Sequence, residues 1–238
     1  MFTFLPITLL LYYVSPRVLK NSILLLASLI FYAWGEPIYV FLMIGTILID
    51  YLLAILIDRN RDDYSKCKWI FILTIILNVS ILGFFKYFGF FVNNINSIFN
   101  LNIPFEGLAL PIGISFYTFQ VLSYIVDVYL GKVEVQYNLI NFATYVTMFP
   151  QLVAGPIVQY QTIEEQLNTR QESVFKFGEG VERFIQGLGK KILLANNIGM
   201  LWTTISSLEL SSISVLTAWL GIIAYTFQIY FDFSAYSD

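Results

Sequence analysis

The stretch PIYVFLMIGTILIDYLLAILI, residues 37–57, decides the class of fold, because Asp50 is its only charged residue. A helix needs roughly 20 apolar residues, each advancing about 1.5 Å, to cross a hydrocarbon core of about 30 Å. Residues 69–85, 108–130 and 213–231 form comparable apolar stretches. We therefore predict an all-α, polytopic transmembrane helical protein in which these segments cross the bilayer.

Other apolar segments are shorter or less regular. Residues 138–158 form an irregular one, and residues 2–14 and 21–34 form two short ones that we expect to tilt or to pack in the interior. The composition agrees with a membrane class, since 58% of the residues are apolar and 12% are charged. Soluble chains carry about 25% charged residues. A lipid bilayer is the expected environment of most of the chain.

Several classes of function are excluded by residue counts. The chain has 13 basic and 16 acidic residues, so no overall basic field is present to bind nucleic acid. The one cysteine, Cys67, cannot form an intramolecular disulfide, and we expect no metal site. Histidine is absent, which excludes a Ser-His-Asp or Cys-His arrangement within these residues.

The basic residues predict the orientation of the chain in the membrane. No basic residue precedes the first apolar segment, whereas Arg17 and Lys20 follow it. Two segments later, a second polar loop is also basic, with Arg59, Arg61, Lys66 and Lys68. Cytoplasmic loops carry an excess of Lys and Arg, so both loops are expected in the cytoplasm and the amino terminus outside.

One sizeable segment, residues 159–191, is too charged to span and is expected in the cytoplasm or at the membrane interface. Within it, apolar residues recur every three or four positions, at Val174, Phe177, Val181, Phe184 and Leu188. This spacing predicts an amphipathic helix that lies in the interface. No repeat is visible, so we expect residues 1–238 to form one membrane-embedded domain. Because the chain stops directly after an apolar span, we expect its carboxy terminus to be incomplete.

Ionisable residues inside the predicted spans are candidates for the lining of a cavity, because charges in lipid are costly. They are Asp50, Lys86, Asp127 and Asp232. The alternative is structural: Asp50 and Asp127 would hydrogen-bond to neighbouring helices, and Lys86 would extend to the interface.

A continuous helix cannot persist through residues 147–157, which contain Pro150, Gly155 and Pro156. Broken backbone within a bilayer is tolerated where it is buried in protein or lines a water-filled cavity. Gln151 and the freed carbonyl groups are therefore candidate tunnel groups, and Pro150, Gly155 and Pro156 are candidate tunnel residues with them. A simple turn at the interface would explain the same residues equally well.

The end of the last span is unusually polar. Gln228 and Asp232 are four residues apart, so on a helix they share a face that cannot comfortably contact lipid. Hydroxyl and carboxyl groups crowd the same region, at Tyr225, Tyr230, Ser234, Tyr236 and Asp238. This density favours an interior site over a belt of interfacial aromatic residues.

The stretch GLGKK, residues 187–191, is not a phosphate-binding loop, because Phe184 stands where that motif needs Gly and no Ser or Thr follows the lysines. Lys190 and Lys191 could still attract the phosphates of a donor such as coenzyme A. An anchor that follows the positive-inside rule is the commoner explanation.

The sequence resembles the bacterial membrane-bound O-acyltransferase family, in particular its alginate O-acetylase-like branch. The resemblance is carried by four blocks in the family's order: IFYAWGEP at residues 30–37, LPIGISFYTFQ at 110–120, FPQLVAGPI at 149–157 and FQIYFDFSAYSD at 227–238. The second block leads to Tyr124 and Asp127 and adds Gln120 to the candidate tunnel residues.

The resemblance implies a ring of tilted helices around a tunnel in a bacterial cytoplasmic membrane. An acyl group, expected to be acetyl, would pass from a cytoplasmic thioester such as acetyl-coenzyme A to an exported polysaccharide, with the help of an extracytoplasmic acetyl-transfer protein. No bound cofactor is expected. In this family the catalytic histidine lies downstream of the last block, so this chain alone is expected to be inactive.

Two positions depart from the family's pattern. Asn196-Asn197 stands where Asp-Asn is usual after the paired lysines, which makes both asparagines candidates on the donor side, and Ala235 replaces a usual Gly. Three other functions stay open at this stage: D-alanyl transfer to teichoic acids, a transporter, and a non-catalytic scaffold. A transporter would be expected to show related halves, which the sequence lacks.

Overall fold

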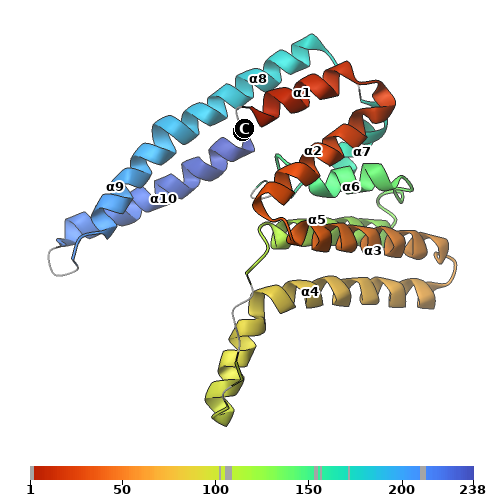
Figure 1. Ribbon diagram of the computed structural model, residues 1–238, viewed down its shortest axis with the longest axis horizontal. Coiled ribbons are helices and arrows are strands. Elements are labelled where there is room, and N and C mark those ends of the chain that lie inside the picture. Colours follow the sequence, from red (N-terminus) through yellow and green to blue (C-terminus); the bar gives the residue numbers. More distant parts are fainter. Residues whose placement is uncertain are drawn as a thin grey trace. The chain divides into compact units, whose positions relative to one another are not determined.

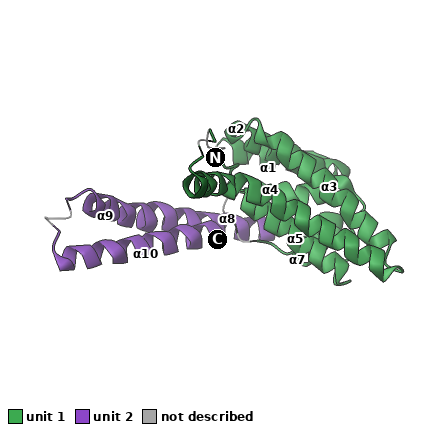
Figure 2. Ribbon diagram, turned by 90° about the horizontal axis from the view of Figure 1, so that it is seen from below, with its two compact units in different colours: residues 1–170 green, residues 171–238 purple. Residues whose placement is uncertain are grey.

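The computed structural model describes residues 3–101, 103–104, 109–152, 155, 157–170, 172–209 and 213–238. This part of the chain consists of helices joined by loops, with no strand (Figure 1). The chain divides into two compact units, residues 1–170 and residues 171–238 (Figure 2). The all-α prediction is confirmed.

The first unit begins with α1 and contains one short 3-10 turn, at Arg17–Leu19. Its helices are α1 (Phe4–Val14), α2 (Lys20–Gly35), α3 (Tyr39–Arg59), α4 (Tyr64–Phe99), α5 (Ile114–Tyr129), α6 (Leu139–Thr147) and α7 (Tyr160–Thr169). The second unit contains α8 (Val174–Gly189), a π-helical turn (Lys190–Ala195), α9 (Asn196–Ser206) and α10 (Val215–Ser237).

Among the described residues, four helical segments are long and apolar enough to cross a membrane: Arg17–Gly35, Tyr39–Arg59, Tyr64–Phe99 and Val215–Ser237. Tyr39–Arg59 and Val215–Ser237 match the predicted segments at residues 37–57 and 213–231. Arg17–Gly35 is longer than the short segment expected at residues 21–34, Tyr64–Phe99 extends well beyond residues 69–85, and α1 is a shorter apolar helix. The prediction of a polytopic transmembrane helical protein is therefore confirmed.

Two predicted segments are shorter in the structure. α5 begins at Ile114 instead of near residue 108, because Pro111 and the left-handed Gly113, at φ 76°, set its start. One face of α5 is buried in protein. α6 ends at Thr147, three residues before Pro150, so residues 138–158 do not form one continuous helix, as the prolines predicted. Residues 108, 153, 154 and 156 lie outside the described part.

Polar side chains at the N-cap, the residue directly before the helix, explain where several helices begin. The Asp63 carboxylate accepts a hydrogen bond from the backbone N–H of Lys66, and Asn138 accepts from the N–H groups of Ile140 and Asn141. The hydroxyls of Ser173 and Ser214 do the same for α8 and α10. Such caps satisfy N–H groups that the first turn of a helix leaves without partners.

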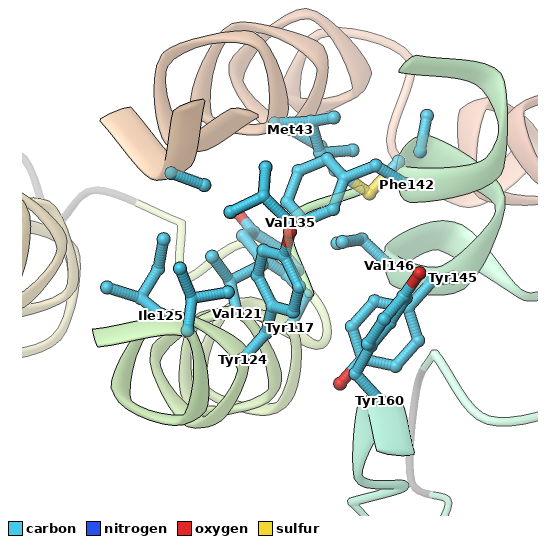
Figure 3. Close-up of a cluster of buried hydrophobic side chains, with 14 of the residues drawn as sticks. Met43, Tyr117, Val121, Tyr124, Ile125, Val135, Phe142, Tyr145, Val146 and Tyr160 are labelled. Atoms are coloured by element: carbon cyan, nitrogen blue, oxygen red, sulfur yellow. The ribbon is translucent and has the colours of Figure 1, made fainter. Parts of the chain in front are cut away.

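The core of the first unit is aromatic. Tyr124 of α5, Phe142 and Tyr145 of α6 and Tyr160 of α7 are all 0–1% exposed and face one another (Figure 3). The ring centres of Tyr124 and Tyr160 lie 4.9 Å apart and those of Tyr145 and Tyr160 lie 5.2 Å apart, in edge-to-face geometry. This cluster fixes α6 against α5, and with it the broken segment that follows α6.

In the second unit, α8, the π-helical turn and α9 form one continuous helix, and α10 runs beside it (Figure 1). Glycine allows the close approach. A Cβ atom at Gly187 would lie 2.6 Å from the backbone oxygen of Ala235, and one at Gly221 would lie 2.9 Å from Cγ2 of Ile205. Small residues at helix contacts are typical of membrane proteins, where packing replaces the hydrophobic effect between helices.

Candidate functional site

The residues after α6 form a turn that is held by two side-chain amides. Nε2 of Gln120 and Nε2 of Gln151 both donate to the backbone oxygen of Tyr145, at 2.8 and 3.0 Å. This oxygen lies in the last turn of α6, where carbonyl groups lack helical partners. The two glutamines therefore cap the end of the helix, which is a structural role that the sequence analysis did not assign to them.

Gly155 and Pro150 shape the same turn. A Cβ at Gly155 would lie 2.6 Å from Cα of Gln151, so only glycine fits, and the Gly155 N–H donates to the Gln151 oxygen at 3.1 Å. Pro150 is exposed on the turn. Pro156, the other predicted tunnel residue here, lies outside the described residues.

The three ionisable residues that were predicted to lie inside spans of the first unit have partners nearby. Asp50 is 1% exposed, and its Oδ1 accepts a 2.6 Å hydrogen bond from Nδ2 of Asn78, which joins α3 to α4. Asp127 pairs with Lys132 at 3.7 Å. Nζ of Lys86 lies 5.5 Å from the centre of the Tyr87 ring. These contacts are those that a structural role requires.

Tyr160 does not provide a base at neutral pH. Nε2 of Gln136 donates to its hydroxyl at 2.8 Å, and burial raises the pKa of Tyr160 to about 12. The hydroxyl therefore keeps its proton and acts as a hydrogen-bonding group of the core.

In the second unit the structure brings together the two predicted lysines and the polar end of α10. Nζ of Lys191 forms an ion pair with Asp232. Nζ of Lys190 lies 2.5 Å from Oδ2 of Asp238 and donates to the Ser234 hydroxyl at 3.2 Å. These contacts occur at the π-helical turn, a feature frequent at functional sites.

The ion pairs neutralise the positive charge that the two lysines were expected to offer to a phosphate group. Each ammonium group has a carboxylate partner, Asp232 on α10 or Asp238 directly after it, so the two pairs together are neutral. A phosphate group that bound Lys190 or Lys191 would have to compete with Asp238 or Asp232. The pairing favours a role in holding α10 in register with the π-helical turn, and it leaves the phosphate hypothesis without a free cation at these two positions.

The remaining candidates of this unit differ in their environment. Nδ2 of Asn197 donates to the backbone oxygen of Leu193 at 2.8 Å, whereas Asn196 lines a groove. Tyr230 and Tyr236 are 62% and 41% exposed. Gln228 is half-buried, and its Oε1 atom is buried without a hydrogen-bond partner.

The groove has a volume of about 630 Å³ and lies between α9 and α10. Gln228 lines it from α10, opposite Asn196, Gly199, Met200, Thr203 and Thr204 of α9 and Ser207, which directly follows α9. A Cβ at Gly199 would lie 2.8 Å from Nε2 of Gln228, so the missing side chain makes room for this amide. Sequence analysis identified Gln228 and Asn196 but missed Gly199, Met200 and the three hydroxyl residues.

No cluster of three or more His, Cys, Asp or Glu side chains that could hold a metal ion occurs in the part of the chain that the structure describes. The candidate residues belong to two sets. Gln120, Asp127, Pro150, Gln151 and Gly155 lie in the first unit, and the others described lie in the second.

Comparison with known proteins finds one family model and several relatives that agree with one another. Residues 132–238 match the model of the membrane-bound O-acyltransferase family. All of the chain aligns with a probable alginate O-acetylase of Pseudomonas aeruginosa at 41% identity, which covers 46% of that protein. The corresponding protein of Azotobacter vinelandii is 39% identical, with 48% of its length covered.

A peptidoglycan O-acetyltransferase of Helicobacter pylori is 33% identical over all of this chain and 51% of its own length. The chain thus spans about half the length of the curated relatives it matches. No solved structure matches the chain. Together, the family model over residues 132–238, the relatives aligned over the whole chain and the apolar helices show that this multi-pass membrane protein is similar to the membrane-bound O-acyltransferase family along its length.

Proposed function

We propose that this chain is part of an O-acyltransferase that moves an acyl group, acetyl in the first instance, across the membrane onto an exported polysaccharide. The observation that carries the proposal is the similarity of the whole chain to proteins named as O-acetylases of alginate and peptidoglycan. The donor would be acetyl-coenzyme A or another thioester on the cytoplasmic side. An extracytoplasmic protein would complete the transfer to the polymer.

In this proposal the chain positions the reacting groups and does not itself move protons. It contains no histidine, the residue expected to polarise or deprotonate the acceptor. Transfer between two bound molecules gains most of its rate from holding them in the right geometry. The turn after α6 and the α9–α10 groove are the parts of the chain suited to that task, and residues 1–238 alone would be inactive.

The proposed orientation places the amino terminus outside a bacterial cytoplasmic membrane. It rests on the basic loops at Arg17 and Lys20 and at residues 59–68, which the positive-inside rule assigns to the cytoplasm. The loop between α3 and α4 would then lie on the side of the thioester donor.

The function can be tested with inverted vesicles of native membranes, which contain the full-length protein together with the extracytoplasmic protein and are loaded with acceptor polysaccharide. Radiolabelled acetyl-coenzyme A is added outside, and label in the polymer is counted. Alginate and peptidoglycan fragments are compared as acceptors, and a D-alanyl carrier-protein thioester is compared as donor. Vesicles with residues 1–238 alone serve as the matched control.

Acetyl label that reaches a polymer only in vesicles with the full-length protein supports the proposal. If only the D-alanyl donor labels the polymer, the transferred acyl group is D-alanyl and not acetyl. No transfer from either donor, by protein that is folded and abundant, would contradict the assignment as a transferase and favour a scaffold.

A further inference from the structure

α4 is longer than the helix that runs antiparallel beside it. It has 36 residues, about 54 Å at 1.5 Å per residue, whereas α3 has 21 residues, about 32 Å. At one end of the pair, Sγ of Cys67 donates to the oxygen of Ile57. At the other end, the ring centre of Tyr39, the first residue of α3, lies 5.6 Å from that of Phe85. α3 therefore accompanies α4 only as far as Phe85, and residues 64–85 suffice to cross a hydrocarbon core of about 30 Å.

The rest of α4, residues 86–99, takes a different direction. The first part of α4 runs alongside α3 and α5, and the last part, in yellow, turns away across their direction (Figure 1). Spanning helices run along the membrane normal with a moderate tilt. A helix that turns across them where the span ends therefore runs along the membrane surface.

The segment after α4 leads back to the same end of the span. Asn96 forms two hydrogen bonds with the backbone of Ile103, at 3.1 and 3.0 Å, so the chain reverses beside the helix. The Tyr39 hydroxyl donates to the oxygen of Ala109 at 2.8 Å. The chain thus leaves the end of α3 at residue 86 and returns to it by residue 109, on one side of the membrane.

The side chains of residues 86–99 divide into an apolar and a polar face. Apolar residues three or four positions apart form one row along the helix, and each is between 40% and 71% exposed. They are Tyr87, Phe91, Ile95 and Ile98. The opposite face contains Lys86, Asn93 and Ser97, and Phe90 and Asn94 lie at one border between the two faces. This is the pattern of a helix at a boundary between water and lipid.

Lipid is the partner that suits the apolar row, because the row continues a helix that already lies in the bilayer. A second crossing is excluded, since residues 86–99 extend only about 21 Å and include three asparagines. Five of their side chains are aromatic, as in other interfacial helices. Lys86, their one charged residue, lies where the span ends, and its long side chain reaches the headgroups from there.

We propose that residues 86–99 form an interfacial helix whose binding partner is the surface of the lipid bilayer. Its apolar row lies among the upper acyl chains, and Lys86, Asn93 and Ser97 lie among headgroups and water. The surface is the one opposite the basic loop at residues 59–68, which is the outer surface in the proposed orientation. α4 then crosses the membrane once, with residues 64–85, and continues along its surface.

The depth of this helix is measured by spin labelling of the full-length protein in vesicles of phosphatidylethanolamine and phosphatidylglycerol. A nitroxide is attached to the ketone of p-acetylphenylalanine, which replaces Ile95, Asn93 or Ile76 in separate proteins. Ile95 and Asn93 lie on opposite faces of the helix, and Ile76, 57% exposed, is the reference within the span. Power saturation compares collisions with oxygen, which concentrates in lipid, and with a water-soluble nickel chelate.

We expect the label at residue 95 about 5–10 Å below the headgroup boundary, the label at residue 93 in contact with the chelate and the label at residue 76 deepest. Three results would overturn the proposal. Equal contact of residues 93 and 95 with the chelate would place the helix in water. A depth that increases steadily from residue 86 to residue 99 would make it part of a span. A label at residue 95 that neither reagent reaches would mean that protein covers the row.

A matched pair of variants tests the apolar row itself, with the label at residue 91. Ile95→Asp should shift this label towards water, because a carboxylate among acyl chains is costly. Asn93→Asp places the same charge on the polar face and should leave the depth unchanged. An unchanged depth in the Ile95→Asp protein, or an equal shift in both proteins, would show that the row does not lie in lipid.

Discussion

At the scale of single residues, the contact between Asp50 and Asn78 shows how a charge in a span is accommodated. Asp50 is 1% and Asn78 3% exposed, and their 2.6 Å hydrogen bond joins α3 to α4. The sequence identified Asp50 because it interrupts an apolar stretch. It could not identify Asn78, because a neutral amide within an apolar helix gives no signal of its partner.

We expect Asn78→Leu to destabilise the protein by about 1–3 kcal/mol, because it leaves the buried Asp50 carboxyl without its donor. The double variant Asp50→Leu with Asn78→Leu should lose less than the sum of the two single changes, since it removes both polar groups. Thermal unfolding in detergent measures all three. Strictly additive losses would show that the two side chains do not interact.

The ion pair between Lys191 and Asp232 allows a charge exchange. We expect Lys191→Asp alone to destabilise the second unit through repulsion from Asp232, and Lys191→Asp with Asp232→Lys to recover most of the loss. The two side chains are 48% and 31% exposed, so a coupling of only about 0.2–1 kcal/mol is expected. A double-mutant cycle on purified protein in detergent gives this value. No recovery in the exchanged protein would argue against the pairing.

At the scale of elements, two glycines of α8 distinguish the cost of a steric clash from the gain in helix propensity. Gly187 packs against the backbone of Ala235, whereas Gly180 of the same helix has open space around it. We expect Gly187→Ala to destabilise the protein by about 1–3 kcal/mol, because backbone cannot yield as a flexible side chain can. Gly180→Ala, the matched control, should stabilise by up to about 1 kcal/mol through helix propensity. Equal effects in detergent unfolding would contradict the close contact of α8 with α10.

Element boundaries show what the sequence could and could not predict. Apolar length predicted α3 and α10, because crossing a bilayer imposes it, and it located α2 and α4 but underestimated their lengths. It overestimated α5, since a buried helix is as apolar as a spanning one, and only Pro111 and Gly113 indicated its later start. The π-helical turn at Lys190–Ala195 had no recognisable signal, so the pairing of adjacent lysines with one helix was not foreseen.

At the scale of the whole molecule, the four sequence blocks predicted a resemblance to the membrane-bound O-acyltransferase family, and the comparisons confirm this resemblance. The blocks did not predict what the candidate residues contact. Gln120 and Gln151 cap α6, and Asp232 pairs with Lys191. Such partners depend on how helices that are distant in sequence pack, which local patterns do not encode.

Acyl transfer by the full-length protein carrying Asp232→Asn tests the account most directly. The variant and the exchanged protein, Lys191→Asp with Asp232→Lys, are compared with the unmodified enzyme at equal abundance and verified folding. Because the Lys191–Asp232 pair holds the end of α10 in register, the Asp232→Asn protein should transfer label from acetyl-coenzyme A more slowly, and the exchanged protein should recover most of the lost rate. Transfer at the unmodified rate by the folded Asp232→Asn protein would contradict this account.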